Sequence, residues 1–495
     1  MNGKGVILSY DCSLMGSINV MTEYQNYYNL GSTGSASTGI VLSIFQLGQM
    51  VGALFAWVND WRGRKVMILF GCTAVVAFSI FTATAPTLGS FIGVRFLLSF
   101  FSTLASVAAP VLLVELAPPL LRGSVAGGYN TLYYMGSIVA TFGNISCLLI
   151  IITILLAIYG CNLHLHRNIN WHLPLWLQTV CPSIVVLFGY WMPESPRWLI
   201  AKGRREEARR FLIKHHTNGD ENRPIVALEM AEIEESLSHG GIRSARDYFN
   251  IKALFSTRAR RYRIMLVVAW SWFGQFSGNN YLPTVITAVG ITSVSTLQLL
   301  NGIYAVTGWI AASIGARCHD VVGRRKMFTG SCASMGVCLA IITGVMAKYQ
   351  HDNSDTNASS AMIAFIFIFG VVFDVVRVGP PAHTVMPLIS KNTICVQMVR
   401  WCPRSLLAAQ DLSTHLLPPG RAEHIILVES KIAFPEIHII YAFFVLWDCF
   451  EFVFVYVVFM ETKGRTLELE VVFESNSPRE ASTRKMVPND AAVLE

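Results

Sequence analysis

The sequence predicts an all-α membrane protein that crosses the bilayer many times. Hydrophobic residues make up 53% of the 495 residues, and charged residues only 14%, against about 25% in a soluble domain. The charges also cluster: residues 193–263 hold 25 and residues 461–495 hold 12, leaving 32 in the other 389. Ten apolar runs have the length of about 20 residues that a spanning helix needs. Helices are expected because lipid cannot satisfy an open strand edge.

Ten spans are clear and two are doubtful, which gives a nominal total of twelve. The clear spans are 39–58, 66–86, 91–114, 124–144, 173–192, 264–288, 297–316, 327–347, 361–376 and 438–460. The first span, near 5–21, is short and carries Asp11. The eleventh should lie within 391–436, where no apolar run of sufficient length occurs.

Lysine and arginine in the connecting segments predict the orientation, since they remain on the cytoplasmic side. Short basic segments follow the spans that end near 58 and 316, and the segment 193–263 carries 15 positive and 10 negative residues. These segments share one side if both termini also lie in the cytoplasm, as expected for a multi-pass plasma-membrane protein.

This arrangement divides the chain into four parts. We expect an N-terminal helix bundle at 1–192, a charged cytoplasmic linker at 193–263, a C-terminal bundle at 264–460 and a cytoplasmic tail at 461–495. Within the linker, the sequence predicts helices at 204–215 and 226–237. The linker is interpreted as a solvated linker domain, with a partner or regulatory surface as the alternative.

Two markers repeat along the chain at nearly the same offset. Asp60-Trp61-Arg62-Gly63-Arg64-Lys65 recurs 260 residues later as Asp320-Val321-Val322-Gly323-Arg324-Arg325-Lys326. Glu194-Ser195-Pro196-Arg197 has a counterpart 267 residues later, Glu461-Thr462-Lys463-Gly464-Arg465. Two bundles of parallel topology, with a substrate site between them near the midplane, are a known transporter architecture.

The repeated turn has a physical interpretation. Glycine allows a tight reversal between two helices, and an aspartate at a helix end can pair with the arginines or with a helix N-terminus. Pairs of this kind break when two bundles rock, so they suit a gate. A purely topogenic role for the arginines is the alternative.

Eight motifs resemble those of the sugar porter family in the major facilitator superfamily, most closely its fungal lactose permease and hexose transporter branch. They follow the family's order over nearly the whole chain: SYDCSLMGS at 9–17, DWRGRK at 60–65, VRFLLSF at 94–100, VELAPPLLRG at 114–123, MPESPRWL at 192–199, GQFSGNN at 274–280, DVVGRRK at 320–326 and METKGRTL at 460–467. The resemblance implies two six-helix bundles related by a pseudo-repeat.

The resemblance also assigns roles to charged residues. An acid in the first span marks proton-coupled family members, and its partner is the arginine of the fourth span; here these are Asp11 and Arg95. A static ion pair is the alternative. The implied gating residues are Asp60, Arg62, Arg64, Glu115, Arg122, Glu194, Arg197, Asp320, Arg324, Arg325 and Glu461.

The ligand residues are expected to be neutral and polar, because amide side chains both donate and accept hydrogen bonds, as sugar hydroxyls do. The matching family motif binds sugar through Gln275 and Asn280, with Asn279 between them, and Asn130 takes the place of a sugar-binding glutamine. Asn130 could instead join helices. Tyr281 and Trp309 could stack on a sugar ring or simply pack.

Several segments depart from the family's pattern. The first span is short, 144–156 reads as an apolar insertion, and the seventh span is shortened after Asn280. The tenth span carries Asp374 and Arg377. Residues 391–436 contain nine charges, which indicates a shifted reading frame or incorrect splicing; a diverged loop is the alternative.

The predicted function is secondary active uptake of a sugar with protons, by alternating access. The alternatives are facilitated diffusion, a transporter-like sugar sensor, and an inactive product of incorrect splicing. No nucleophile–base pair, phosphate loop or metal-ligand set is recognisable, so neither an enzyme nor a cofactor is expected. The 11 cysteines are interpreted as small apolar residues. The expected partners are sugar, protons and lipid, with no nucleic acid, and a monomer is favoured.

Overall fold

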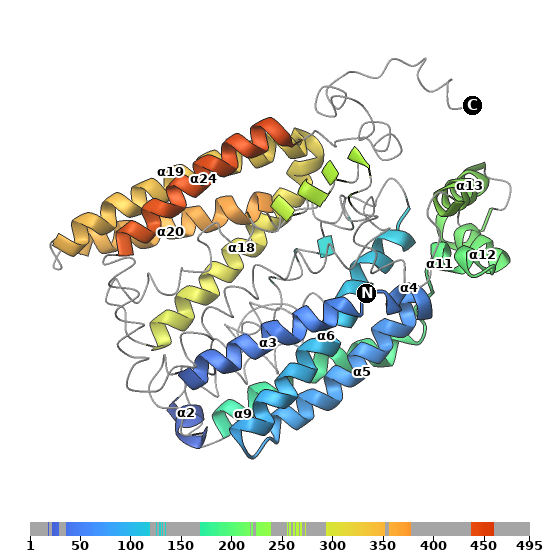
Figure 1. The fold of residues 1–495 in the computed structure, drawn as a ribbon, viewed down its shortest axis with the longest axis horizontal. Coiled ribbons are helices and arrows are strands. Elements are labelled where there is room, and N and C mark those ends of the chain that lie inside the picture. The colour runs from blue at the N-terminus through green and yellow to red at the C-terminus, as the bar shows by residue number, and fades with distance from the viewer. Residues whose placement is uncertain are drawn as a thin grey trace.

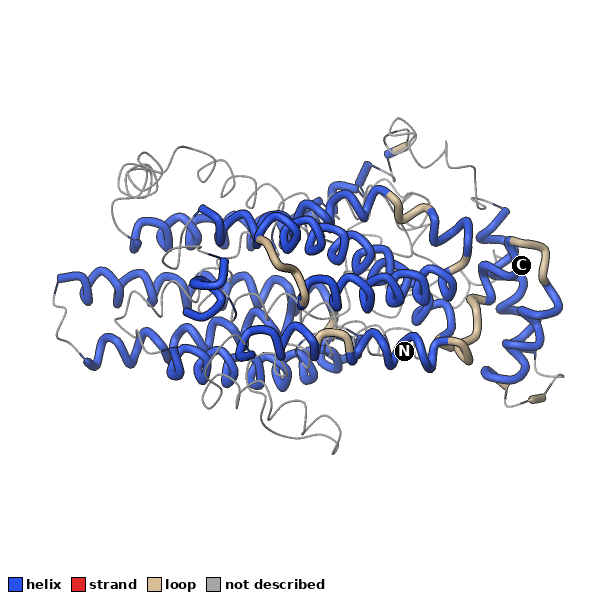
Figure 2. The backbone as a smooth tube through the Cα atoms, turned by 90° about the horizontal axis from the view of Figure 1, so that it is seen from below, coloured by secondary structure: helices blue, strands red, loops and turns tan. Residues whose placement is uncertain are grey.

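The computed structural model describes nine segments of the chain. They are 18, 22–28, 36–118, 169–217, 219–220, 224–238, 294–351, 356–377 and 437–459, with scattered single residues between 125 and 134 and between 255 and 273. Within these segments every regular element is a helix. The long helices run roughly along one axis in two groups, one from each half of the chain (Figures 1 and 2).

The N-terminal group is built around one long helix. Its helices are α2 (Thr22–Tyr28), α3 (Ala36–Leu54), α4 (Val58–Arg62), α5 (Arg64–Ala83), α6 (Leu88–Leu116), α9 (Ile169–Leu177) and α10 (Val180–Gly189). Helix α6 packs against both α3 and α5, and α9 and α10 pack against α5. Small residues bring these backbones together: a methyl group at Gly52 would lie 2.8 Å from the Phe100 carbonyl oxygen. Such close approach is typical of helix packing in membranes.

The C-terminal group has the same kind of packing. It contains α18 (Val294–Val322), α19 (Arg324–His351), α20 (Thr356–Arg377) and α24 (Ile437–Val458). Helix α19 packs against α20 and α24, and α18 packs against α20. Met335, Leu339, Met362, Ile366 and Phe444 form the buried core between α19, α20 and α24.

The described helices confirm most of the predicted spans as helical. The predicted spans 66–86, 91–114, 297–316, 327–347, 361–376 and 438–460 coincide with α5, α6, α18, α19, α20 and α24. The span 39–58 corresponds to α3, which ends at Leu54 before the short α4, and 173–192 is divided between α9 and α10. The segments 5–21, 144–156 and 391–436 lie outside the described residues, as do most of 124–144 and 264–288.

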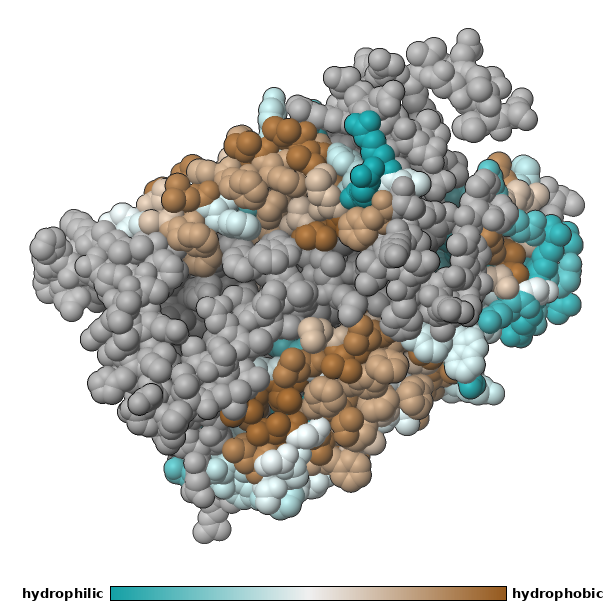
Figure 3. Space-filling view, in the orientation of Figure 1, coloured by the Kyte–Doolittle hydropathy of each residue, from teal (hydrophilic) through white to brown (hydrophobic). Residues whose placement is uncertain are grey.

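Three stretches of the described helices are long and apolar enough to cross a bilayer by themselves. They are Arg64–Ala83, Leu88–Leu116 and Arg325–Val345. On the face shown in Figure 3, mostly apolar residues cover the visible parts of both helix groups, and the largest polar area lies over α12 and α13. Apolar side chains facing outward are expected where lipid replaces water as the solvent.

The linker contains the two predicted helices together with a shorter one. These are α11 (Pro196–Ala201), α12 (Arg205–His216) and α13 (Pro224–Ser238), which lie together at the end of the molecule that also holds α4 (Figure 1). They share a small core of Leu199, Ala208, Leu212, Val226 and Met230. A shared core makes this part of the linker a compact unit rather than an extended connection.

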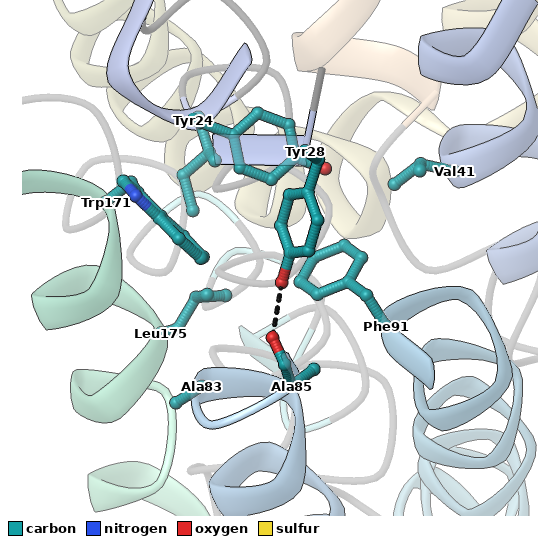
Figure 4. Packing of buried hydrophobic residues seen from close by; sticks show 9 residues of the cluster. Tyr24, Tyr28, Val41, Ala83, Ala85, Phe91, Trp171 and Leu175 are labelled. Atoms are coloured by element: carbon teal, nitrogen blue, oxygen red, sulfur yellow. Dashed lines mark hydrogen bonds between the residues drawn. The ribbon is translucent and has the colours of Figure 1, made fainter. Parts of the chain in front are cut away.

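The opposite end of the N-terminal group is closed by aromatic packing. Tyr24 and Tyr28 of α2 pack with Phe91 and Trp171 (Figure 4), and the Tyr28 hydroxyl donates a hydrogen bond of 2.8 Å to the Ala85 carbonyl oxygen. The side chains of Tyr24 and Trp171 are 0% exposed. This cluster fixes α2 across the ends of α5, α6 and α9.

Candidate functional site

Arg64 is the centre of a charged cluster at the α4–α5 turn. Its Nη2 lies 2.8 Å from Asp60 Oδ1, and its Nε lies 3.3 Å from Glu115 Oε2 at the end of α6. The Arg64 side chain is only 8% exposed, so water screens these interactions little. Three predicted gating residues, one each from α4, α5 and α6, therefore meet in one largely buried network.

Glu194, in the segment that follows α10, caps the N-terminus of α5 at the same end of the bundle. Its Oε1 accepts hydrogen bonds from the backbone N–H groups of Arg64 and Lys65, both at 3.1 Å. The first N–H groups of a helix lack intrahelical partners, and the helix dipole favours an anion there. The carboxylate thus links the segment after α10 to the start of α5.

Two neighbours of Glu194, which the sequence analysis did not select, complete the cluster. The Ser195 hydroxyl donates a hydrogen bond of 2.6 Å to Glu115 Oε2 and accepts one of 3.3 Å from the Trp198 backbone N–H. The Trp198 indole N–H donates to the Asp60 carbonyl oxygen at 3.0 Å. The PESPRW motif therefore contacts both the turn and the end of α6.

The two repeated turns have the same backbone shape. Gly63 has φ of 104° and Gly323 has φ of 103°, a region that residues with a Cβ rarely adopt. At Gly63 a Cβ would also lie 2.7 Å from Glu194 Oε2. The internal repeat predicted from the sequence is thus present in the backbone of both turns.

A second repeated contact was not predicted. Lys65 Nζ donates to the Tyr190 carbonyl oxygen at 2.7 Å and lies 5.5 Å from the ring centroid of Tyr190. In the other half, Arg325 Nη2 donates to the Tyr456 carbonyl oxygen at 2.8 Å, with its Cζ 5.5 Å from that ring. In each half a cation two residues after the glycine binds the end of the half's last helix, where helix dipoles favour cations. The sequence did contain a signal for this contact: Tyr190 lies four residues before Glu194, and Tyr456 lies five residues before Glu461.

The remaining predicted gating residues are only partly placed. Arg62 lies over the Trp61 ring at 4.5 Å, and Arg197 is the second residue of α11, in a half-buried position. Neither joins the Arg64 cluster through any contact between described residues. The side chains of Asp320 and Arg324, and all of Arg122 and Glu461, lie outside the described residues.

Arg95 is buried within α6, as the coupling prediction requires. Its side chain is 1% exposed, and the guanidinium carbon lies 5.1 Å from the Phe45 ring centroid on α3. Arg95 also interacts with Tyr24. Burial raises the pKa of Tyr24 to about 12, and the positive charge of Arg95 opposes that rise. Asp11 lies outside the described residues, so the Asp11–Arg95 pair stays a prediction.

The predicted ligand residues are mostly outside the described segments. This applies to Asn130, Gln275, Asn279, Asn280 and Tyr281. Trp309 is described, and it is 38% exposed on α18. Its neighbour Gly308 faces the other half of the molecule.

At Gly308 the two halves meet through a hydrogen bond. The Tyr134 hydroxyl, from the predicted span 124–144, donates to Asp374 Oδ1 on α20. Both side chains are buried, Asp374 being 2% exposed. The sequence analysis noted Asp374 only as a departure from the family's pattern; the signal available was a carboxylate inside a span, which is a functional candidate by default.

The linker reaches the same end of α6 as the charged cluster. His216 Nδ1 lies 2.8 Å from Glu229 Oε2, and its Nε2 lies 3.3 Å from the Leu116 carbonyl oxygen. Both partners are acceptors, so protonated histidine satisfies both. His216 and Glu229 are each 3% exposed, and the residue before Leu116 is Glu115 of the cluster.

The sequence is similar to those of known membrane transporters. The family model described as "Sugar (and other) transporter" matches residues 3–388, ending just before the segment 391–436. The chain is 26% identical over 382 residues to the quinate permease of Neurospora terricola, covering 73% of this chain and 68% of that protein. It is also 26% identical to the probable metabolite transport protein CsbC of Bacillus subtilis, covering 92% and 90%.

The fold matches a solved transporter. The proton:xylose symporter XylE, bound to 6-bromo-6-deoxy-D-glucose, superposes with a TM-score of 0.73 at 18% identity, covering 96% of this chain and 97% of that chain. This protein is therefore a multi-pass membrane transporter rather than an enzyme, and it belongs to the sugar (and other) transporter family with the major facilitator fold.

Proposed function

We propose that the protein takes up a sugar together with protons across the plasma membrane, by alternating access. The observation that carries this proposal is the Arg64 cluster, which joins α4, α5, α6 and the segment after α10 at one end of the bundle. These largely buried ion pairs hold the helices of the N-terminal half together at that end. A half that is fixed in this way can move as one body when the two halves rock against each other.

The proton is proposed to couple through Asp11 and Arg95. Arg95 is fully buried, and a buried cation needs a counter-ion or strong hydrogen bonds. A facing carboxylate supplies that charge, and protonation of the carboxylate releases the pair. The fold relative XylE is a proton:xylose symporter, which supports this coupling.

The substrate is proposed to be a neutral polyol of the sugar class, bound by Asn130, Gln275, Asn279 and Asn280, with Tyr281 and Trp309 nearby. The relatives named quinate permeases favour a second candidate, a polyhydroxylated carboxylic acid. Both ligands present several hydroxyl groups on a ring, which amide side chains recognise.

Reconstitution in liposomes tests the proposal. Labelled hexoses, pentoses, disaccharides and quinate are offered with an inward proton gradient, with and without a protonophore. We expect one sugar to accumulate, and both the protonophore and Asp11→Asn to abolish the accumulation, while Asp11→Glu retains part of it. Uptake indifferent to the protonophore and to Asp11→Asn would indicate facilitated diffusion, and binding without uptake would indicate a sensor.

A further inference from the structure

The contact between Tyr134 and Asp374 joins the two halves of the molecule. Gly308, which faces both residues, is the central residue of α18, and a methyl group there would lie 2.6 Å from Asp374 Oδ2 and 2.8 Å from the Tyr134 ring. Tyr134 is likewise central in the predicted span 124–144. Coupling-ion sites in such transporters lie at the interface of the halves near the midplane.

Asp374 is poorly suited to carry a charge in this position. Its Oδ1 accepts the hydrogen bond from Tyr134, and its buried Oδ2 has no hydrogen-bond partner. The titratable groups that face it from the described parts of the packed elements are Tyr134 and Tyr304 of α18. No described lysine, arginine or histidine forms an ion pair with it. A buried carboxyl group without a cation is stabilised by binding a proton.

We propose that Asp374 is a proton-binding site that responds to the contact between the halves. While the halves touch, Asp374 holds a proton and accepts the Tyr134 hydrogen bond through its carbonyl oxygen. When the halves separate, water reaches the carboxyl group, and its proton passes to water and leaves a carboxylate. Each cycle of opening and closing then releases and rebinds one proton at this position.

This inference rests on the proposed transport cycle, but it assigns a proton site separate from Asp11. Another buried acid provides a matched control. Asp448 of α24 is 0% exposed, and its Cβ lies 3.7 Å from where a methyl group at Gly336 of α19 would be. It therefore lies within the C-terminal half, so its environment need not change when the two halves separate.

Transport by the full chain in liposomes is the first test. One pH unit corresponds to about 1.4 kcal/mol per proton, so one coupled proton supports about tenfold accumulation of sugar. We expect Asp374→Asn, which mimics the protonated form, to lose proton-driven accumulation while retaining sugar exchange between the two sides. We expect Tyr134→Phe to keep accumulation but to change the pH of half-maximal uptake, and Asp448→Asn to behave as the unmodified chain.

Infrared spectroscopy of the purified chain is the second test, and it does not depend on transport. Each protonated buried carboxyl group gives a carboxylic-acid C=O band, so the spectrum of Asp374→Asn is compared with that of the unmodified chain. We expect Asp374→Asn to lose one C=O component that Asp448→Asn retains. The proposal is overturned if Asp374→Asn loses no such component. It is also overturned if Asp374→Asn accumulates sugar normally, or if it only weakens sugar binding without affecting proton coupling. If sugar uptake by the unmodified chain does not depend on protons, the proposed symport itself is overturned instead.

Discussion

Backbone geometry and charge together determine which residues can form the charged cluster at the α4–α5 turn. Asp60, Arg64 and Glu194 could be selected from the sequence because their motifs are specific and repeated, and Glu115 because its motif resembles that of the family. Ser195 could not, since serine is common and its role depends on which acid lies within hydrogen-bond distance. The distance of 2.6 Å from its hydroxyl to Glu115 Oε2 exists only after α6 and α11 have packed together.

Replacing Gly63 with alanine should destabilise the protein. The φ of 104° strains any residue with a Cβ, and that Cβ would lie 2.7 Å from Glu194 Oε2. We expect the free energy of unfolding to fall by about 1 to 3 kcal/mol, measured by thermal or denaturant unfolding in detergent. Gly203→Ala is the control, because Gly203 has φ of 79° but no atom within 4 Å of an added Cβ. Equal effects of the two substitutions would contradict a specific contact with Glu194.

Replacing Glu194 with glutamine should weaken the start of α5. The amide keeps one acceptor for the Arg64 and Lys65 N–H groups but loses the charge that the helix N-terminus favours. We expect a loss of about 1 to 2 kcal/mol in the free energy of unfolding. The matched control is Glu207→Gln, whose ion pair with Arg204 is half exposed and should contribute little. Unchanged stability in Glu194→Gln would show that the carboxylate does not cap α5.

Helices of the linker are attached to the bundle rather than free in solution. The charge pattern of 204–215 correctly predicted a helix, because acidic residues gather in the first turn of α12 and basic ones in the last. The attachment could not be predicted. His216 is far from Leu116 in the chain, and only the packed structure brings its ring to the carbonyl end of α6.

Replacing His216 with alanine should detach α13 from α12 and α6. The change leaves the carboxylate of Glu229 buried without its partner, which costs about 3 kcal/mol or more in a buried pair. Hydrogen exchange of α13 backbone amides should therefore become faster. Arg205→Ala removes only the exposed pair with Glu234 and serves as the control. If α13 exchange is the same in both variants, His216 does not hold the linker.

Across the whole molecule, the internal repeat explains why two similar bundles could be predicted from the sequence and why the contact between them could not. The offset of 260 residues between the aspartates predicted two similar bundles, and the matching φ values of Gly63 and Gly323 confirm that the turns are alike. The contact between Tyr134 and Asp374 has no counterpart in this repeat. It arises where the two halves meet, so no pattern within either half indicates it.

The segment 391–436 leads to a prediction about the chain itself. It holds nine charges where the eleventh span is expected, and charged residues are costly within a bilayer. Sequencing of transcripts across this region should therefore give a different, apolar reading of span length. A transcript that encodes the printed residues would contradict the idea, and the chain should then fail to transport.

The sequence by itself determined the membrane class, the helical spans, the repeat and most of the charged cluster. These depend on local properties: the spans on hydrophobicity, the turns on glycine. Only the tertiary structure decided which distant groups share a buried environment, as for Ser195 with Glu115 and Tyr134 with Asp374. A hydrogen bond or a buried charge depends on neighbours within a few ångströms, and helix packing, not sequence separation, determines those neighbours.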